Sequence, residues 1–211
     1  MTGQSPQMGM VVEMADGGDL TDLYKQKKGQ DYSFKIGLKI VLGAAKGLAH
    51  MHSMPTPIVH RDVKSGNILV MADGVTGKLG DCGVSRRVDL ESNMTIIGSP
   101  LWAAPELLAG KRYCEDVDTF SLGAVLYEVA VRELPYESDF AKYKKQHGNN
   151  GKNKIMREIA AGQRRPELAG KARKCRRYGV GGAFRKRESA VAGCEFGRVL
   201  GFGRGKQFTR D

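Results

Sequence analysis

The chain has 211 residues, 41% of them hydrophobic, which is enough for one globular domain with a buried core. Its net charge of +11 is divided unevenly, since residues 1–140 hold 14 Lys and Arg against 18 Asp and Glu, and residues 141–211 hold 20 against 5. No apolar run approaches the ~18 residues of a membrane span, and the N-terminus has no signal-peptide pattern. The four cysteines lack the spacing of a zinc site, which favours reduced thiols. We therefore expect a cytoplasmic protein, with nuclear entry through its basic clusters as the alternative.

Hydrophobic patterning in the first half of the chain predicts short strands alternating with helices. Apolar residues recur at helical spacing in one long segment, and Pro55 and Pro57 mark its end. A turn at Asp73-Gly74 separates two short apolar runs, as in a hairpin. The expected elements, in chain order, are a strand over 8–13, a helix over 20–27, a helix over 36–51, and strands over 68–71 and 78–81.

The second half of the chain predicts helices and exposed loops. A short helix is expected over 105–109, and a longer one over 118–131 is apolar enough to be buried. Residues 142–154 are rich in Lys, Gly and Asn and predict an exposed loop, and a short amphipathic helix follows over 155–161.

Residues 60–69 form the most informative stretch, His-Arg-Asp-Val-Lys-Ser-Gly-Asn-Ile-Leu. It matches the pattern H-R-D-L/V-x-x-x-N at every fixed position and so resembles the catalytic loop of eukaryotic-type protein kinases. Further stretches follow in the family's order, which argues against a chance match. They are Asp81-Cys82-Gly83 at the place of D-F-G, Ala104-Pro105-Glu106 as A-P-E, and Asp118 to Gly123 at the start of the family's buried central helix.

The resemblance covers about residues 11–166 and implies an α+β fold, the mainly helical C-terminal lobe of a protein kinase with short β-hairpins. Within it, residues 11–20 resemble the hinge between the two lobes, and residues 81–106 resemble the activation segment. Residues 1–10 are interpreted as the remnant of an N-terminal-lobe strand, with the rest of that lobe absent. Residues 167–211 are expected to form an irregular, disordered basic tail.

The resemblance also implies ATP and Mg²⁺ as cofactors, and phosphoryl transfer to a serine or threonine hydroxyl of a protein substrate. Asp62 resembles the residue that orients the hydroxyl and accepts its proton. Lys64 is similar to the lysine that serine/threonine kinases direct at the transferred phosphate. Asn67 and Asp81 resemble the magnesium ligands. Within the family, Lys64, the run Gly98-Ser99-Pro100-Leu101-Trp102 and the run Gly18-Asp19-Leu20 are most similar to the tyrosine-kinase-like group of serine/threonine kinases.

The hinge resemblance supplies the candidate nucleotide contacts. Backbone groups of Glu13 and Ala15 are expected to bond the adenine edge, and Asp19 is expected to reach the ribose. Leu69 would form the floor under the adenine ring. Asp118 is expected to have a structural role, in which it caps backbone amides of the catalytic loop.

Several parts of the family's N-terminal lobe are not found before the hinge, namely a G-x-G-x-x-G loop, the lysine of V-A-I-K and a helix with its Glu partner. Because these parts hold the nucleotide phosphates, we expect this chain alone to be weakly active or inactive. Two alternatives stay open, a non-catalytic kinase-like binding module and an incomplete gene product. Ser85, Ser92 and Thr95 are candidate phosphorylation sites in the activation segment, and the sequence does not choose between them.

Positive clusters follow the kinase-like region at Lys171 to Arg177 and Arg185 to Arg187. One interpretation is weak contact with nucleic acid or another acidic surface. The other is a solvated tail outside the family's pattern, which we favour because that pattern stops after Pro166.

Overall fold

The computed structural model describes residues 11–26, 33–87, 99–148 and 151–166, and these fold mainly into helices with a few short strands. The α+β, mainly helical class predicted from the sequence is confirmed. The helices are α1 (Leu20–Gln26), α2 (Phe34–His52), α3 (Pro105–Leu108), α4 (Asp116–Val131), α5 (Glu137–His147) and α6 (Gly151–Ala160), with short 3-10 turns at Ser65–Asn67 and Cys82–Val84. The strands β1 (Ile58–Val59) and β4 (Arg86–Arg87) form one antiparallel pair, and β2 (Ile68–Val70) and β3 (Gly77–Leu79) form another.

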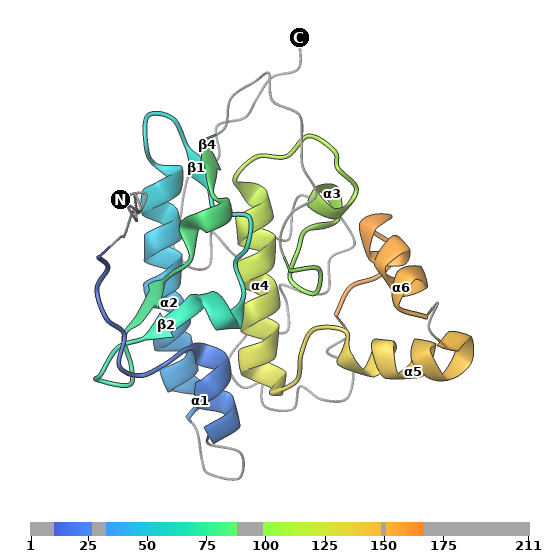
Figure 1. The fold of residues 1–211 in the computed structure, drawn as a ribbon, viewed down its shortest axis with the longest axis horizontal. Coiled ribbons are helices and arrows are strands. Elements are labelled where there is room, and N and C mark those ends of the chain that lie inside the picture. Colours follow the sequence, from blue (N-terminus) through green and yellow to red (C-terminus); the bar gives the residue numbers. More distant parts are fainter. Residues whose placement is uncertain (1–10, 27–32, 88–98, 149–150, 167–211) are drawn as a thin grey trace, which may run out of the picture.

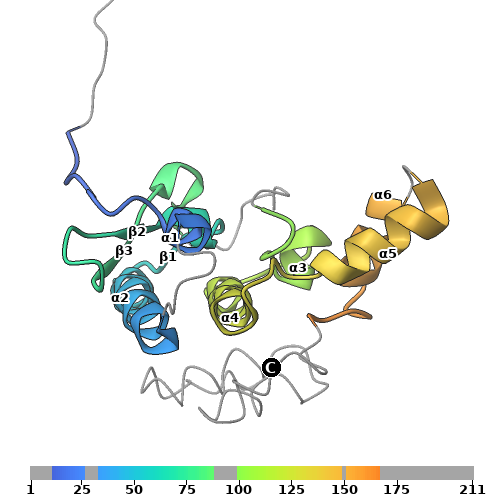
Figure 2. The ribbon, with the colours of Figure 1, turned by 90° about the horizontal axis from the view of Figure 1, so that it is seen from below.

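Helices α2 and α4 pack side by side at the centre of the fold (Figures 1 and 2). Their apolar faces meet in one core, to which α1 and β2 add Leu20 and Ile68. Burial of this surface supplies most of the driving force for folding, because apolar area removed from water stabilises by roughly 25 cal/mol per Å². The core side chains of the two helices include Ile40, Val41, Ala44 and Leu48 of α2, and Leu122, Val125, Leu126 and Val129 of α4.

Strand β3 crosses α2 at two glycines, Gly43 and Gly77. A Cβ atom added at Gly43 would lie 2.1 Å from the carbonyl oxygen of Gly77, and one added at Gly77 would lie 2.1 Å from the carbonyl oxygen of Ile40. Only glycine therefore permits the helix and the hairpin to touch backbone to backbone. This contact fixes the β2–β3 hairpin, which carries the end of the catalytic loop, on the central helix.

Helices α5 and α6 correct the expectation of an exposed loop over residues 142–154. Both helices are mostly polar, and the lysines that suggested a loop are good helix formers on exposed positions. Tyr136, Tyr143, Ile155 and Ile159 are buried together in a small separate core, which stabilises the helical pair. The long-range contacts between α5 and α6 therefore outweigh a local sequence that favours a loop.

Three further differences concern the strands. Residues 11–13 of the expected strand over 8–13 have no strand structure, and residues 1–10 lie outside the described residues. The predicted hairpin is confirmed with narrower bounds, so that Asp81 lies beyond β3. Strands β1 and β4 were not predicted, because two residues are too few to show a period.

The expected tail over 167–211 also lies outside the described residues. The described helices include none that is long and apolar enough to span a bilayer.

Replacement of Gly43 by alanine tests the close contact between α2 and β3. We expect Gly43→Ala to lower the free energy of unfolding by about 2 kcal/mol or more, because the new methyl group meets backbone that cannot move aside. Gly123→Ala in α4 is the matched control, since nothing lies within 4 Å of its added Cβ and helix propensity alone predicts a gain of about 0.5–1 kcal/mol. Urea unfolding measures both, and equal stabilisation by the two changes would contradict the proposed contact.

Candidate functional site

The catalytic loop is held in place by a buried carboxylate on α4, that of Asp118. Its Oδ2 accepts a hydrogen bond from the backbone N–H of His60 at 2.8 Å, and its Oδ1 accepts one from the backbone N–H of Arg61 at 2.8 Å. The His52 ring nitrogen Nε2 lies 2.8 Å from Oδ2. These bonds hold Arg61 at a φ of 68°, a left-handed conformation that non-glycine residues rarely adopt. The expected structural role of Asp118 is confirmed.

Beyond this anchor, one carboxylate oxygen of Asp62 has hydrogen-bond partners and the other has none within the described residues. Its Oδ2 accepts hydrogen bonds from Lys64 Nζ at 2.7 Å and from Asn67 Nδ2 at 3.0 Å. Its Oδ1 is buried and has no hydrogen-bond partner within the described residues. Burial alone would raise the pKa of Asp62, but hydrogen bonds from Lys64, Ser99 and Asn67, together with the charge of the Lys64 ammonium, hold it below its ordinary value. Asp62 is therefore ionised at neutral pH, with one oxygen able to accept a further hydrogen bond.

Lys64 joins this loop to the segment before α3. Its Nζ donates to Ser99 Oγ at 3.0 Å as well as to Asp62. The ammonium side chain is about one quarter exposed, at 27%, so it faces the open side of the site. The segment that begins at Ser99 and the catalytic loop are thus linked by a single cation.

Asp81 follows β3 next to the catalytic loop. The N–H of Gly80 donates to the carbonyl oxygen of Asn67 at 2.8 Å, and the ring nitrogen Nε2 of His60 lies 3.0 Å from the carbonyl oxygen of Gly80. Asp81 itself has a φ of 55°, and its exposed carboxylate accepts a bond of 3.3 Å from the N–H of Gly83. The backbone therefore brings Asp81 beside Asn67.

The oxygen ligands of Asn67 and Asp81 suit magnesium, which keeps water or phosphate oxygens as further ligands, better than a metal ion that takes all of its ligands from the protein. Within the described ranges, no cluster of three or more His, Cys, Asp or Glu residues could hold a metal ion. Magnesium is usually held by one or two carboxylates together with phosphate oxygens and water, so a larger cluster is not required. The Asn67 side chain gives its amide hydrogens to Asp62, which leaves its carbonyl oxygen for a ligand.

The four predicted nucleotide contacts lie along the hinge and β2. Asp19 pairs with Leu69 as an isolated bridge, and the N–H of Val70 donates to the carbonyl oxygen of Gly18 at 2.8 Å. One oxygen of Asp19 also caps α1 by accepting from the N–H of Asp22 at 2.8 Å. The hinge residues that precede this bridge are therefore aligned with the strand that carries Leu69.

Glu13 and Ala15 lie further back in the hinge. Their backbone groups make no hydrogen bonds within the described part of the chain, and the Glu13 carboxylate pairs with Lys78 Nζ at 2.6 Å. Their apolar neighbours Val11, Val12 and Met14 are exposed. The structure thus brings Asp19 and Leu69 together and leaves the backbone of Glu13 and Ala15 open.

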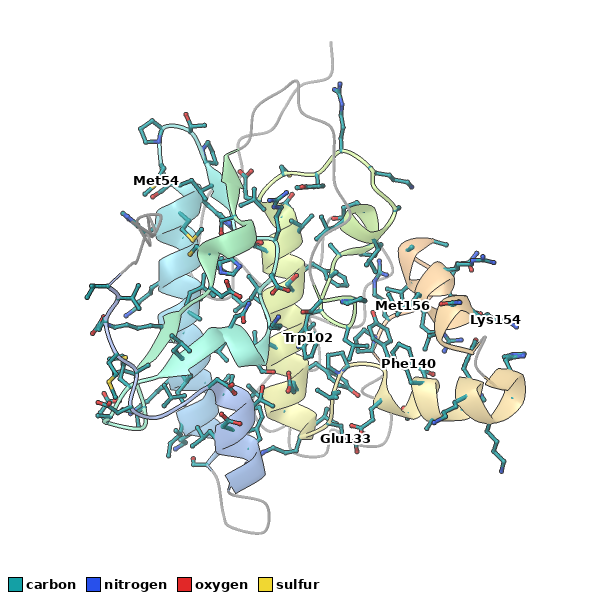
Figure 3. All side chains as sticks on the ribbon, in the orientation of Figure 1. Met54, Trp102, Glu133, Phe140, Lys154 and Met156 are labelled. Carbon is teal, nitrogen blue, oxygen red and sulfur yellow. The ribbon has the colours of Figure 1, made fainter. Side chains whose placement is uncertain are left out.

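Sequence reasoning missed a second buried carboxylate, that of Glu128 on α4. Its Oε1 accepts from Ser65 Oγ at 2.9 Å, its Oε2 accepts from Trp102 Nε1 at 3.1 Å, and Thr21 Oγ1 donates in turn to Ser65 Oγ at 3.0 Å. Figure 3 shows Trp102 against α4. Burial raises the pKa of Glu128 from 4.5 to about 7, against the opposing effect of its two hydrogen bonds. A lone acidic residue in an apolar helix was the signal that could have revealed it.

The activation segment is described only at its two ends. Cys82, which stands at the place of the phenylalanine in D-F-G, is exposed. Ser85 has a buried hydroxyl without a hydrogen-bond partner within the described residues. The other two candidate phosphorylation sites, Ser92 and Thr95, lie outside the described residues.

Comparison with known proteins agrees with the site geometry. The profile of the protein kinase domain family matches residues 1–175. A putative serine/threonine-protein kinase/receptor of Acanthamoeba polyphaga mimivirus is 38% identical over 140 residues, which cover 66% of this chain and 8% of the relative. The probable serine/threonine-protein kinase roco8 of Dictyostelium discoideum is 37% identical over 139 residues, which cover 62% of this chain and 7% of the relative. The serine/threonine-protein kinase Nek5 of Mus musculus is 36% identical over 132 residues, which cover 62% of this chain and 21% of the relative.

The chain thus has the fold and the loop geometry of a phosphotransferase lobe, and a profile that matches well over half of its length. It belongs to the protein kinase family. The chain spans less than a tenth of the first two relatives and about a fifth of the third.

The anchoring role of Asp118 predicts a large loss of stability on an isosteric change. In Asp118→Asn one of the two oxygens becomes an NH₂ group that faces a backbone N–H, so we expect the free energy of unfolding to fall by about 3 kcal/mol. Asp116→Asn, at an exposed position of the same helix, is the control and should cost about 0.5 kcal/mol. Chemical denaturation measures both, and comparable small losses would show that the anchor is dispensable.

Glu128 predicts a pH-dependent contribution to stability. Its pKa is higher in the folded state than in the unfolded chain, so folding favours the protonated form, and stability declines as pH rises from about 4.5 to 7. Each pKa unit corresponds to ~1.4 kcal/mol, which gives a total decline of about 3 kcal/mol. Glu128→Gln should remove this component. The measurement is the difference in unfolding free energy between wild type and variant at pH 4.5 and 8, and a difference independent of pH would disprove the assignment.

Proposed function

We propose that the chain acts in serine/threonine protein phosphorylation, with Asp62 as the base that receives the proton of the substrate hydroxyl. The observation that carries the proposal is the state of the Asp62 carboxylate. One oxygen is fixed by Lys64 and Asn67, and the other has no hydrogen-bond partner within the described residues. A serine or threonine hydroxyl of a protein substrate is a donor of the required kind.

In the proposed reaction, the substrate oxygen forms a bond to the γ-phosphorus of ATP while the bond to the β-phosphate oxygen breaks and ADP leaves. The hydroxyl proton passes to the Asp62 carboxylate. Lys64, which already contacts both Asp62 and Ser99, lies where its charge would offset negative charge on the transferred group. Ser99 would thereby tie the substrate-binding segment to the reacting centre.

Asn67 and Asp81 would hold Mg²⁺, which neutralises charge on the nucleotide phosphates when bound. Asn67 suits this role because its amide hydrogens point to Asp62 and its carbonyl oxygen faces away from them. For the nucleotide itself we propose the backbone of Glu13 and Ala15 at the adenine edge, Asp19 at the ribose and Leu69 under the ring. The bridge between Asp19 and Leu69 supports the placement of the last two.

A phosphotransfer assay tests the role of Asp62. The purified chain is incubated with radiolabelled ATP, Mg²⁺ and a serine-containing protein such as myelin basic protein. Asp62→Asn is expected to lower the rate by about 10²- to 10⁴-fold, as for loss of a general base. Asp73→Asn is the matched control, because Asp73 lies in the exposed β2–β3 turn and the asparagine side-chain oxygen can accept the same two backbone hydrogen bonds, from Val75 and Thr76. Turnover that survives in Asp62→Asn at the wild-type rate would refute the proposed base.

Nucleotide binding separates the enzyme from the rival hypothesis of a non-catalytic binding module. Because a ligand of the folded state raises the melting temperature, Mg-ATP should stabilise the wild-type chain, and Asp81→Asn should reduce this effect. The same shift in the wild type and in Asp81→Asn would remove Asp81 from the metal site. No shift in either would favour the binding module.

A further inference from the structure

The hairpin formed by α5 and α6 carries a surface of a single charge sign. We define this basic surface by five exposed side chains, Lys142, Lys144, Lys145, Lys154 and Arg157. The sequence contains no Asp or Glu from residue 141 to residue 157. The three lysines of α5 spread over the solvent side of the helix, opposite the buried Tyr143. No ion pair neutralises the lysines of the basic surface or Arg157 within the described residues.

The acidic residues on either side of this stretch are already occupied. Arg164 pairs with Asp139 at 2.9 Å and with Glu158 at 2.9 Å. Tyr143 adds a hydrogen bond of 2.7 Å from its hydroxyl to Glu158. The two carboxylates therefore serve an internal network, and of the basic surface only Lys154 lies near enough to Glu158 to lower its pKa.

The same network holds the basic surface on an ordered support. The guanidinium of Arg164 lies 5.0 Å from the centre of the Tyr143 ring, and Ile155 and Ile159 are fully buried beside it. The lysines thus project from fixed helices, and an opposing charge can meet them at little further cost in conformational entropy.

The position of the hairpin relates it to the proposed phosphorylation site. Helix α6 packs against α3, which lies between the hairpin and α4 (Figures 1 and 2). Figure 3 shows Phe140 and Met156 on the side of the hairpin toward the rest of the lobe, and Lys154 at its outer end. Helix α3 directly follows the segment in which Ser99 contacts Lys64. A protein bound on the hairpin would therefore lie on the side of the lobe that carries α3 and the segment before it.

We propose that the basic surface of the α5–α6 hairpin docks an acidic segment of the protein substrate, a proposal that rests on the proposed kinase function. Charge complementarity identifies the partner as a Glu- or Asp-rich peptide segment. Insertion into a lipid surface would require apolar side chains among the lysines, and the exposed large hydrophobic residues of the described chain all lie elsewhere, at Val11, Val12, Met14, Leu42 and Leu134. Stacking on the bases of single-stranded nucleic acid would require exposed aromatic rings, and Tyr143 is buried.

A charge-removal variant tests the docking surface directly. Lys142→Gln, Lys144→Gln and Lys145→Gln are combined, since glutamine is nearly as good a helix former as lysine. The matched control combines Lys35→Gln, Lys39→Gln and Lys46→Gln, three exposed positions of α2. The Lys- and Arg-rich residues 167–211 are the same in both variants, so their contribution to binding cancels.

The probe is a fluorescein-labelled peptide of alternating glutamate and glycine, and its dissociation constant is measured by fluorescence anisotropy. We expect the α5 variant to bind on the order of ten-fold more weakly than wild type, from the loss of three exposed charge contacts, and the α2 control to bind within about two-fold. Replacement of the same three α5 lysines by arginine should keep the affinity, which excludes misfolding as the cause. Equal losses in the α5 and α2 variants would overturn the proposal.

Two further measurements separate this proposal from its rivals and from the proposed function. Asp62→Asn should bind the peptide as wild type does, so that failure of catalysis leaves the docking result readable. A serine peptide with a glutamate-rich extension should show a raised KM and an unchanged kcat in the α5 variant, because docking precedes the chemical step. A larger loss of affinity for oligothymidylate or for phosphatidylserine vesicles than for the acidic peptide would reject a protein partner.

Discussion

One buried carboxylate determines the shape of the catalytic loop. Asp118 accepts three hydrogen bonds, two of them from consecutive backbone amides that the loop exposes when Arg61 takes its left-handed conformation. An ionised group inside a protein is tolerated only when its hydrogen bonds replace those of water, and here the loop backbone supplies them. The constraint is mutual, since the loop amides supply hydrogen bonds to the buried carboxylate and the carboxylate supplies acceptors to the loop amides. The orientation of Asp62 depends on this exchange.

Helix α4 carries a second carboxylate, and the two together fix both ends of the loop. Asp118 holds the loop at His60 and Arg61, whereas Glu128 holds it at Ser65. The two acids are ten residues apart, a rise of about 15 Å along the helix. They differ in their partners, because Glu128 meets only the neutral donors of Ser65 and Trp102, and burial then raises its pKa to about 7. Helix α4 thus fixes the position of the catalytic loop relative to the segment before α3, because the loop and Trp102 of that segment both bond to its side chains.

The residues of the loop could be predicted from the sequence because their chemistry depends on local order. Asp62, Lys64 and Asn67 lie within six residues, and the fold needs only one turn to bring them into contact. Helices α2 and α4 were equally accessible, since each buries a continuous apolar surface. Glu128 was not, because its hydrogen bonds join residues 63 and 26 positions apart in sequence, and no local pattern records such a contact. The same holds for Gly43, because a side chain at this position is excluded only by the backbone of β3, which lies across α2.

The α5–α6 hairpin shows how a polar sequence acquires helical structure through distant partners. Its lysines are compatible with a helix but contribute no side chain to the core, so the polar pattern of the segment resembles that of a loop. The stabilising contacts come from Tyr143 and from Arg164, which lies beyond the second helix and joins Asp139 to Glu158. With these two acids engaged, the hairpin has one further acid, Glu137 at the start of α5, and the five residues of the basic surface are exposed to water. The packing that makes the segment helical is therefore the same packing that presents the basic surface to water, and a docking role needs no structure beyond that packing.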